Sequence, residues 1–506
     1  MVSNAEDNAL INKALVHAVY AFSVRWVITR PPKIDSNFYA DITQEAQDRL
    51  SDVLWHRARE NMYPLLGRPS YRSSLALYLF GITPVTSQNS EFRFSDVCLA
   101  TSLMQLKELR LGELNRSSYD WSCRNSAEPS SGARSAEFDS QHSHMENTAY
   151  WFGIVSDVSR CLLSGKASVL SLDSTINPPI WQLVGEQLDE FRANYGNLHR
   201  SQLPLPEETV FKVLSHASAS KTLCWWRIVE VRNATFRGET LVSIKEAVAL
   251  CLEEIGRFEN IFLPFINLFI RDFMFIKDEL QIGVFLLTLH FHLGVLTFLD
   301  VIHQIPNLRD ILPSYSILLL SSTRELNNLI RVVISPTGAQ PNGNILLLDP
   351  YPEHISRALW YAGRAILELG KEFTFSPLSV EAMFAVPLTG LSMLQKVSFS
   401  SRERLRALQQ LHSSPGVVNA VNNPSSPTMF PSPVSMSSRS IGLESAEHLA
   451  DEIATYPNLI NDSVERRERA LGIDQNASFS EIDLSFIGEL DLNQFDMLIG
   501  QWEFMV

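Results

Sequence analysis

The residues best able to do chemistry in this chain occur as close pairs of histidines, carboxylates and tryptophans. These pairs are His142 and His144, Glu253 and Glu254, Asp278 and Glu279, His290 and His292, and Trp225 and Trp226. Two histidines two residues apart point about 200° apart on a helix, which suits a shared metal ion poorly. Adjacent carboxylates also face apart, whereas acid–base pairs usually come from separate elements. We therefore interpret His290 and His292 as buried or half-buried helix residues, and the tryptophan pair as core packing with a ligand pocket as the alternative.

No short motif with a known catalytic mechanism occurs in the chain. There is no GxxxxGK[ST] or GxGxxG phosphate-binding loop, no GxSxG nucleophile elbow and no HExxH metal site. The cysteines lack a CxxC pair, and an odd, scattered set argues against a disulfide framework. They are Cys98, Cys123, Cys161, Cys224 and Cys251. We expect an intracellular protein that is not an enzyme and holds no cofactor or metal in this chain, with an all-α enzyme as an alternative.

Charge and hydropathy argue against several classes of partner. The net charge is −14 over 506 residues, and Glu403 interrupts the densest basic cluster, Arg402, Arg404 and Arg406. A protein that grips DNA or an anionic membrane directly usually carries a basic patch. Residues 280–299 are uncharged and long enough to span a bilayer, but they contain five polar side chains and have acidic flanks. We interpret them as a buried helix of a large soluble domain.

The elements that must position these residues are predicted to be helices. Apolar residues recur at three- and four-residue spacing along seven segments. These segments are 8–27, 44–58, 94–112, 147–164, 241–256, 280–302 and 356–371. Alternating β-branched runs are scarce, and 330–335 is a short strand candidate. The sequence thus predicts an all-α fold, in which a large multi-helix domain precedes a disordered linker and an acidic-apolar C-terminal segment.

Composition divides the chain into a helical domain, residues 1–412, and three further segments. Within the domain, residues 116–146 are rich in Ser and small residues and are predicted to be a disordered insertion. Residues 413–440 are half Ser and Pro, which predicts a linker because so little apolar surface cannot offset the entropy of ordering. A short amphipathic segment, 441–469, precedes the end, 470–506. The linker's Ser-Pro sites are phosphorylation candidates, with a plain spacer as the alternative: Ser414, Ser426 and Ser432.

The end of the chain combines acidic and bulky apolar residues without a single Lys or Arg after Arg469. Its apolar residues are Phe479, Ile482, Leu484, Phe486, Leu490, Leu492, Phe495, Leu498, Trp502 and Phe504. Acidic spacing keeps such side chains solvated and free to fold into grooves on partner proteins. We predict that residues 470–506 are an acidic activation segment. An amphipathic helix that docks on the helical domain is the alternative.

One motif in the middle of the chain has a recognisable spacing. Residues 145–167 read MENTAYWFGIVSDVSRCLLSGKA, in which an aromatic pair is followed by Asp after six residues and by Gly after eight more. This resembles the fungal-specific transcription factor domain, the middle homology region of the six-cysteine zinc cluster transcription factors. The matching residues are Tyr150, Trp151, Asp157 and Gly165. Val158 stands where that family has Arg, and Lys166 and Ala167 where it has Arg-Pro. The resemblance implies structural roles, with the Asp capping or pairing with a nearby basic group.

The resemblance covers roughly residues 8–400, through segments such as SSLALYLFGITP, LLTLHFHLGVLTFLD and SRALWYAGRAILEL. It implies an all-α regulatory domain in which effectors or partners modulate activation. The family's zinc cluster needs six cysteines in CxxC-led groups, because two zinc ions share the thiolates. This chain has no CxxC. Zinc binding and direct contact with promoter DNA would therefore both require a zinc cluster upstream of Met1. Without such a cluster, a partner protein would contact the DNA.

These patterns together predict a nuclear regulator, an activator, of genes transcribed by RNA polymerase II. Its helical domain would regulate the acidic C-terminal segment. The expected partners are coactivator or mediator-type proteins, with a homodimer left open and no membrane. The alternative is an all-α small-molecule-sensing or scaffold protein without direct transcriptional output.

Overall fold

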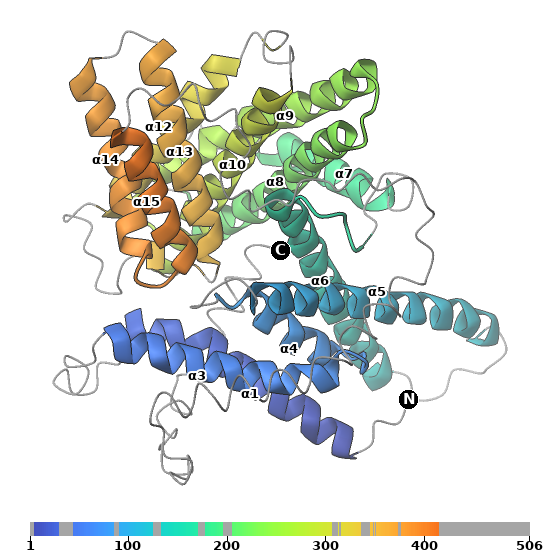
Figure 1. Cartoon of the computed structure of the whole chain (residues 1–506). Helices are drawn as coiled ribbons and strands as arrows, with labels where there is room; N and C mark the ends of the chain where they lie inside the picture. The colour runs from blue at the N-terminus through green and yellow to red at the C-terminus, as the bar shows by residue number, and fades with distance from the viewer. Residues whose placement is uncertain are drawn as a thin grey trace. The chain divides into compact units, whose positions relative to one another are not determined.

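The computed structural model is helical throughout the part of the chain that it describes. That part comprises residues 5–29, 44–84, 91–124, 133–170, 178–195, 205–305, 312, 315–334, 345–347, 349, 351–372 and 376–413. It contains thirteen α-helices and no strand, and all of it belongs to one compact unit (Figure 1). The all-α prediction is confirmed for these residues.

The helices divide by position along the chain. The first four are α1 (Ala5–Thr29), α3 (Gln44–Met62), α4 (Tyr71–Ile82) and α5 (Glu91–Arg124). The middle five are α6 (Ala133–Ser164), α7 (Pro178–Tyr195), α8 (Glu207–Phe236), α9 (Leu241–Arg271) and α10 (Asp278–Gln304). The last four are α12 (Tyr315–Ile334), α13 (Pro352–Glu372), α14 (Pro377–Leu394) and α15 (Phe399–Ser413). Short 3-10 turns, η1 (Tyr63–Leu65), η3 (Phe273–Phe275) and η5 (Ile345–Leu347), connect some of them.

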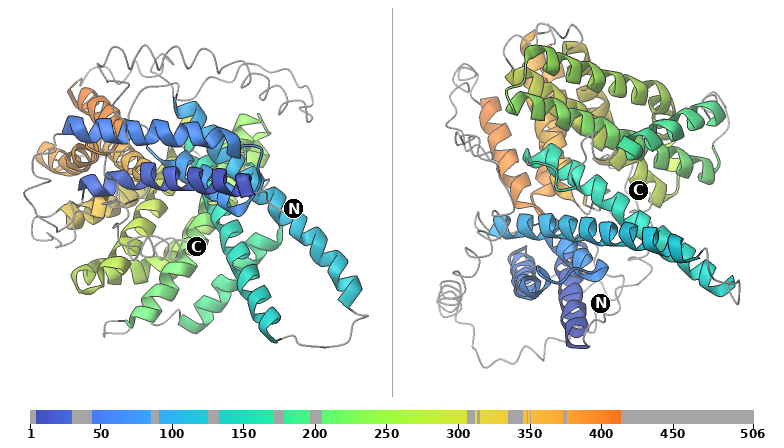
Figure 2. Two further views of the ribbon diagram at one scale, coloured as in Figure 1. Left: turned by 90° about the horizontal axis from the view of Figure 1, so that it is seen from below. Right: turned by 90° about the vertical axis from the view of Figure 1, so that its right-hand side faces the viewer.

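A first hydrophobic core lies among α1, α3, α4 and α5, and Figure 2 shows α1 and α3 side by side. Trp55 of α3 and Phe80 of α4 are both buried there, with ring centroids 5.1 Å apart. Ser70 caps the start of helix α4, and its hydroxyl accepts a hydrogen bond from the backbone N–H of Ser73 at 3.1 Å. A serine at this position satisfies a backbone donor that would otherwise have no partner. The start of α4, and with it the position of Tyr78 on the same helix, is thereby fixed.

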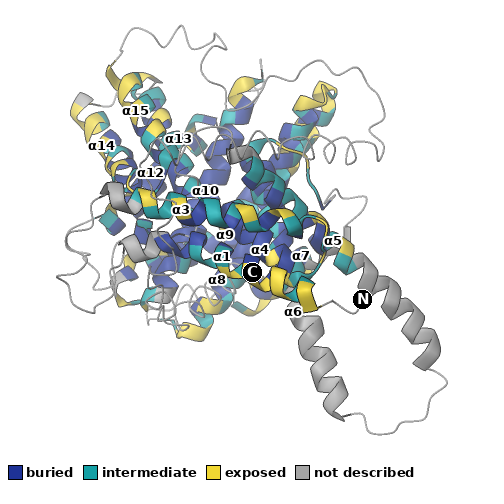
Figure 3. Cartoon of the chain, turned by 60° about the horizontal axis from the view of Figure 1, so that its bottom comes forward, coloured by how far each residue is buried: buried dark blue, intermediate teal, exposed yellow. Residues whose placement is uncertain are grey.

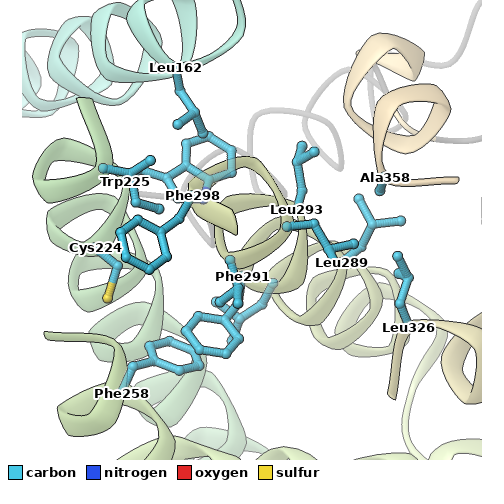
Figure 4. Packing of buried hydrophobic residues seen from close by; sticks show 14 of the residues in the cluster. Leu162, Cys224, Trp225, Phe258, Leu289, Phe291, Leu293, Phe298, Leu326 and Ala358 are labelled. Atoms are coloured by element: carbon cyan, nitrogen blue, oxygen red, sulfur yellow. The ribbon is translucent and has the colours of Figure 1, made fainter. Parts of the chain in front are cut away.

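The larger core surrounds α10, which is buried on almost every side (Figure 3). Side chains from α6, α8, α9, α12 and α13 converge on it (Figure 4). Phe258 of α9 stacks on Phe291 of α10 with ring centroids 4.0 Å apart. By length and composition alone α10 could cross a membrane, but 94% of its apolar window is buried inside the unit. This burial agrees with the interpretation of residues 280–299 as a core helix.

The predicted helical segments coincide with helices of the structure, whereas the strand candidate was wrong. Residues 330–334 form the end of α12. In this helix Leu326, Ile330 and Val333 are buried at four- and three-residue spacing, so one face packs into the core. Packing of that face outweighs the weak β preference of the branched residues.

The predicted insertion at 116–146 needs correction at both of its ends. Helix α5 continues to Arg124 and helix α6 already begins at Ala133. A helix that packing has nucleated extends easily, because each added residue gains a hydrogen bond. Residues 125–132 lie outside the described residues. So do residues 414–506, which hold the predicted linker with its Ser-Pro sites, the amphipathic segment and the activation segment.

Candidate functional site: the Lys221 cavity

A cavity of about 90 Å³ lies among α4, α5, α6, α8, α10 and the start of α13. Its polar wall includes Lys221, His290, His354 and Asp349, and its apolar wall includes Ile82, Leu99, Phe152 and Val155. We call it the Lys221 cavity. Its volume is well above the roughly 10–15 Å³ that one water molecule needs. Polar groups from four separate parts of the chain therefore meet around a space that can hold a small molecule.

Lys221 of α8 places a side-chain ammonium in this cavity although only 3% of the residue is exposed. Its Nζ lies 4.5 Å from the centroid of the Trp225 ring, a cation–π contact one helical turn away. Burial lowers the pKa of Lys221 from 10.5 to about 8, because the charged form loses its hydration. No carboxylate lies within ion-pair distance of Lys221 in the described part of the chain.

The Trp225 ring that supports Lys221 is held by α10. Its Nε1–H donates a hydrogen bond to the carbonyl oxygen of His290 at 3.0 Å. Gly294, one turn further along α10, makes room for the ring, since a Cβ there would lie 2.6 Å from two of its atoms. The lack of a side chain at Gly294 thus allows α8 and α10 to approach closely enough to form this wall.

Two buried imidazoles complete the polar wall. The rings of His290 and His354 meet edge to face with centroids 4.6 Å apart. Burial is the main cause that lowers both pKa values, that of His354 to about 3 and that of His290 well below 6.5, and the nearby Lys221 charge adds to it. Both rings are therefore neutral at pH 7, so each has one N–H donor and one acceptor nitrogen.

The histidine nitrogens are only partly satisfied. His354 Nε2 lies 2.7 Å from the hydroxyl oxygen of Ser159 on α6, in a hydrogen bond. His354 Nδ1 and His290 Nε2 are buried without a hydrogen-bond partner among the residues that the structure describes. A buried polar atom without a partner is unfavourable. Both histidines line the cavity, so a bound molecule could supply what these two atoms lack.

Hydroxyl groups cover the side of the cavity formed by α4 and α6. The Ser156 hydroxyl donates to the carbonyl of Phe152 at 2.8 Å, and its oxygen lies within hydrogen-bond distance of the phenolic oxygen of Tyr78, at 3.0 Å. Next to His354, Asp349 Oδ1 accepts a hydrogen bond from the backbone N–H of Tyr351 at 2.8 Å. The pKa values of Tyr78 and Tyr351 are raised, mainly by burial, so both phenols stay protonated.

This arrangement has two chemical capacities. An ammonium with two imidazoles beside it can hold an anionic or hydrogen-bonding ligand. Unprotonated, the same lysine is an amine nucleophile, since a pKa near 8 leaves a fraction of it uncharged at neutral pH. Among the described residues no group of three His, Cys, Asp or Glu side chains is placed to hold a metal ion.

The motif residue Asp157 lies beside the cavity in α6 and is completely buried. Its carboxylate pairs with Arg160 at 3.2 Å and accepts hydrogen bonds from the backbone N–H of Val169 at 3.2 Å and of Leu170 at 2.9 Å. It also accepts one from the Ser168 hydroxyl at 2.7 Å. Asp157 therefore ties the segment after α6 back onto the helix. The predicted role, capping or pairing with a basic group, matches this geometry.

The other three motif residues surround the same helix. Gly165 ends α6 with φ of 72°, a left-handed conformation that glycine adopts without strain. Tyr150 is half-buried, with the guanidinium carbon of Arg110 lying 5.6 Å from its ring centroid. Trp151 is half-buried against the larger core. All four motif residues thus have packing or backbone roles, and none of them lines the Lys221 cavity.

The remaining candidates have mixed outcomes. Trp225 and Trp226 are both buried, as are His290 and His292, which confirms the packing interpretation. Trp225 and His290 also line the cavity, so the pocket alternative for the tryptophan pair applies to Trp225. Cys98, Cys161, Cys224 and Cys251 are free and buried. The side chains of Cys123, His142 and His144, and the activation segment, lie outside the described part of the chain.

Lys221 and His354 were not predicted to be site residues. A signal for Lys221 exists in KTLCWWRIV, where a single lysine lies four residues before Trp225 and hence on the same helix face. A cation on the face of a buried aromatic residue is unusual enough to flag. His354 gives no comparable signal, because its contacts with Ser159 and His290 join helices that are far apart in the sequence.

Comparisons of the chain with models of known protein families, with curated proteins and with solved structures find no match.

Proposed function

We propose that this protein is a nuclear regulator of genes transcribed by RNA polymerase II, in which the helical unit controls an acidic activation segment at residues 470–506. The observation that carries the proposal is the composition of that segment. Seven acidic residues and no basic residue are spaced among bulky apolar side chains, after a stretch that is half Ser and Pro. Such a segment can fold into grooves of coactivator or mediator-type proteins. The resemblance of residues 145–167 to the fungal transcription factor domain supports the same assignment.

The Lys221 cavity supports a regulatory role for the helical unit. It offers a small molecule a binding place whose walls come from six elements, so occupancy can change how those helices pack. Contact with promoter DNA would come through a zinc cluster upstream of Met1 or through a partner protein, with a homodimer left open. No cofactor is assigned to this chain.

A tethered reporter assay tests the proposal. The full chain is fused to an unrelated DNA-binding domain, and transcription of a reporter is measured in the nucleus. Replacing Phe495 and Trp502 by Ala should reduce reporter output at least tenfold. Replacing the polar residues Asn493 and Gln501 by Ala is the matched control and should leave the output unchanged. Equal output from both pairs at equal protein levels would contradict an activation segment of this kind.

A second candidate function is a small-molecule sensor without transcriptional output. The cavity with its buried, incompletely satisfied polar groups favours it specifically. A fusion that reaches the nucleus and never activates, together with saturable ligand binding by the purified chain, would favour this candidate over the first.

A further inference from the structure

We infer that the Lys221 cavity is a binding site for a small organic monocarboxylate, held by the Lys221 ammonium and by the side chains of His290 and His354. This goes beyond the transcriptional proposal and does not depend on it. Its support has three parts, namely an uncompensated charge, unused hydrogen-bonding atoms, and the size and lining of the cavity.

The first part is the charge of Lys221. A buried ammonium is strongly unfavourable unless a counter-charge accompanies it. The neighbouring aromatic contact with Trp225 at 4.5 Å offsets only part of that loss. Arg160, the other cation lining the cavity, already pairs with Asp157 at 3.2 Å. A ligand carboxylate would supply the counter-charge that Lys221 lacks in the described part of the chain.

The second part is the pair of unused imidazole atoms. His290 is 5% exposed and His354 is 8% exposed, yet His290 Nε2 and His354 Nδ1 have no hydrogen-bond partner among the described residues. Their rings are 4.6 Å apart and both line the cavity with Lys221. Neutral imidazole N–H groups beside an ammonium match the oxygen atoms of a carboxylate.

The third part is the nature of the walls. A volume of about 90 Å³ suits a short molecule. Ile82, Leu99 and Val155 line the apolar side, where a short hydrocarbon tail can pack. The carboxyl group of Asp349 also lines the cavity, and because repulsion grows with the charge of the ligand, it disfavours a dianion such as hydrogen phosphate more than a single carboxylate. A single carboxylate on a short apolar tail fits these constraints together.

Binding to the purified full chain tests the inference. Straight-chain monocarboxylates from acetate to hexanoate are titrated by calorimetry and by thermal unfolding at pH 7. Butyramide is the neutral control, and sodium chloride and inorganic phosphate are the ionic controls. We expect at least one monocarboxylate to bind saturably and to raise the melting temperature, while butyramide, chloride and phosphate do not. Absence of saturable binding across the series, or equal binding of phosphate, would overturn the inference.

Two variants locate the site. Lys221→Met removes the charge with little change in volume and should weaken monocarboxylate binding at least tenfold. Lys212→Met, on the exposed face of the same helix, is the matched control and should bind as the unmodified protein does. Unchanged binding by Lys221→Met would refute the site. Lys221→Met is expected to fold, because methionine suits a buried position better than an ammonium does.

The pH dependence of affinity gives an independent readout. Affinity should fall about tenfold per pH unit above pH 8, as Lys221 loses its proton. Four titratable groups near Lys221 do not titrate in that range, since His290 and His354 are already neutral and the raised pKa values of Tyr351 and the buried Cys224 keep both protonated. Asp349 and Arg160 are the other charged groups that line the cavity. Affinity that stays constant from pH 7 to pH 10 would mean that Lys221 does not hold the ligand.

Discussion

Replacing Lys221 by Met should make the ligand-free protein more stable at pH 7. A buried lysine whose charge is compensated inside the protein would behave in the opposite way, because its removal would break the pair. The substitution therefore distinguishes a structural lysine from one that is kept for a ligand. Met fills a similar volume and tolerates the irregular surroundings of a core position.

The size of the effect follows from the environment of Lys221. A pKa lowered from 10.5 to about 8 corresponds to about 3 kcal/mol by which the charged ammonium destabilises the folded state at pH 7. The cation–π contact with Trp225 at 4.5 Å offsets up to about 2 kcal/mol of this destabilisation in a desolvated site. The free energy of unfolding should accordingly rise by about 1–3 kcal/mol in Lys221→Met. Lys212→Met should leave it nearly unchanged, because Lys212 pairs with Glu208 on the surface, where water screens the interaction.

Urea unfolding followed by tryptophan fluorescence measures both the gain and its pH dependence. Between pH 8 and pH 10.5 the unfolded chain keeps a proton on this lysine that the folded chain has lost, so the stability of the unmodified protein rises with pH. That rise should be absent in Lys221→Met, and the two proteins should approach each other above pH 10. A variant that is less stable than the unmodified protein at pH 7 would refute the reasoning and indicate that Lys221 is paired.

Three further predictions concern the surroundings of the cavity. Asp157→Ala should lower the free energy of unfolding by about 3–5 kcal/mol in a urea titration, because Arg160 would lose its buried partner. The control is Asp189→Ala, which removes an exposed carboxylate and should cost less than about 1 kcal/mol. An equally small loss in Asp157→Ala would contradict the prediction. Gly294→Ala should destabilise by about 1–3 kcal/mol through the clash with Trp225, whereas Gly256→Ala, which meets nothing within 4 Å, should stabilise by about 1 kcal/mol. Between pH 7 and pH 5 stability should fall by up to about 1.4 kcal/mol per pH unit for each buried neutral histidine, and an unchanged urea midpoint would be inconsistent with their burial. These histidines are His290, His292 and His354.

The helices could be predicted from the sequence where one face is regularly apolar. The burial of residues 280–299 could also be anticipated, because polar residues within the stretch and acidic flanks argue against a membrane span. Residues 330–335 were wrongly predicted as a strand because β-branched residues indicate a strand only weakly. The burial of Leu326 and Val333 on one helix face favours the helix instead. The extension of helices α5 and α6 into residues 116–146 was not predicted, because the sequence there has no regular spacing of apolar residues.

The structural role of Asp157 was predictable because its partners Arg160 and Leu170 are close in the sequence. The cavity was not predictable, because it depends on helix contacts that no local pattern encodes. Ser159 and His354, for example, meet across 195 positions of the chain. His290 was recognised as buried, but its place beside Lys221 follows only from the packing of α8 against α10.

The measurement that tests the central proposal most directly is activation by residues 470–506 alone. This segment is fused to an unrelated DNA-binding domain, and reporter output is compared with that of the full chain and of the chain ending at residue 469. We predict that the segment activates by itself and that the chain without it does not. If residues 470–506 fail to activate although they are expressed and nuclear, the transcriptional proposal is contradicted.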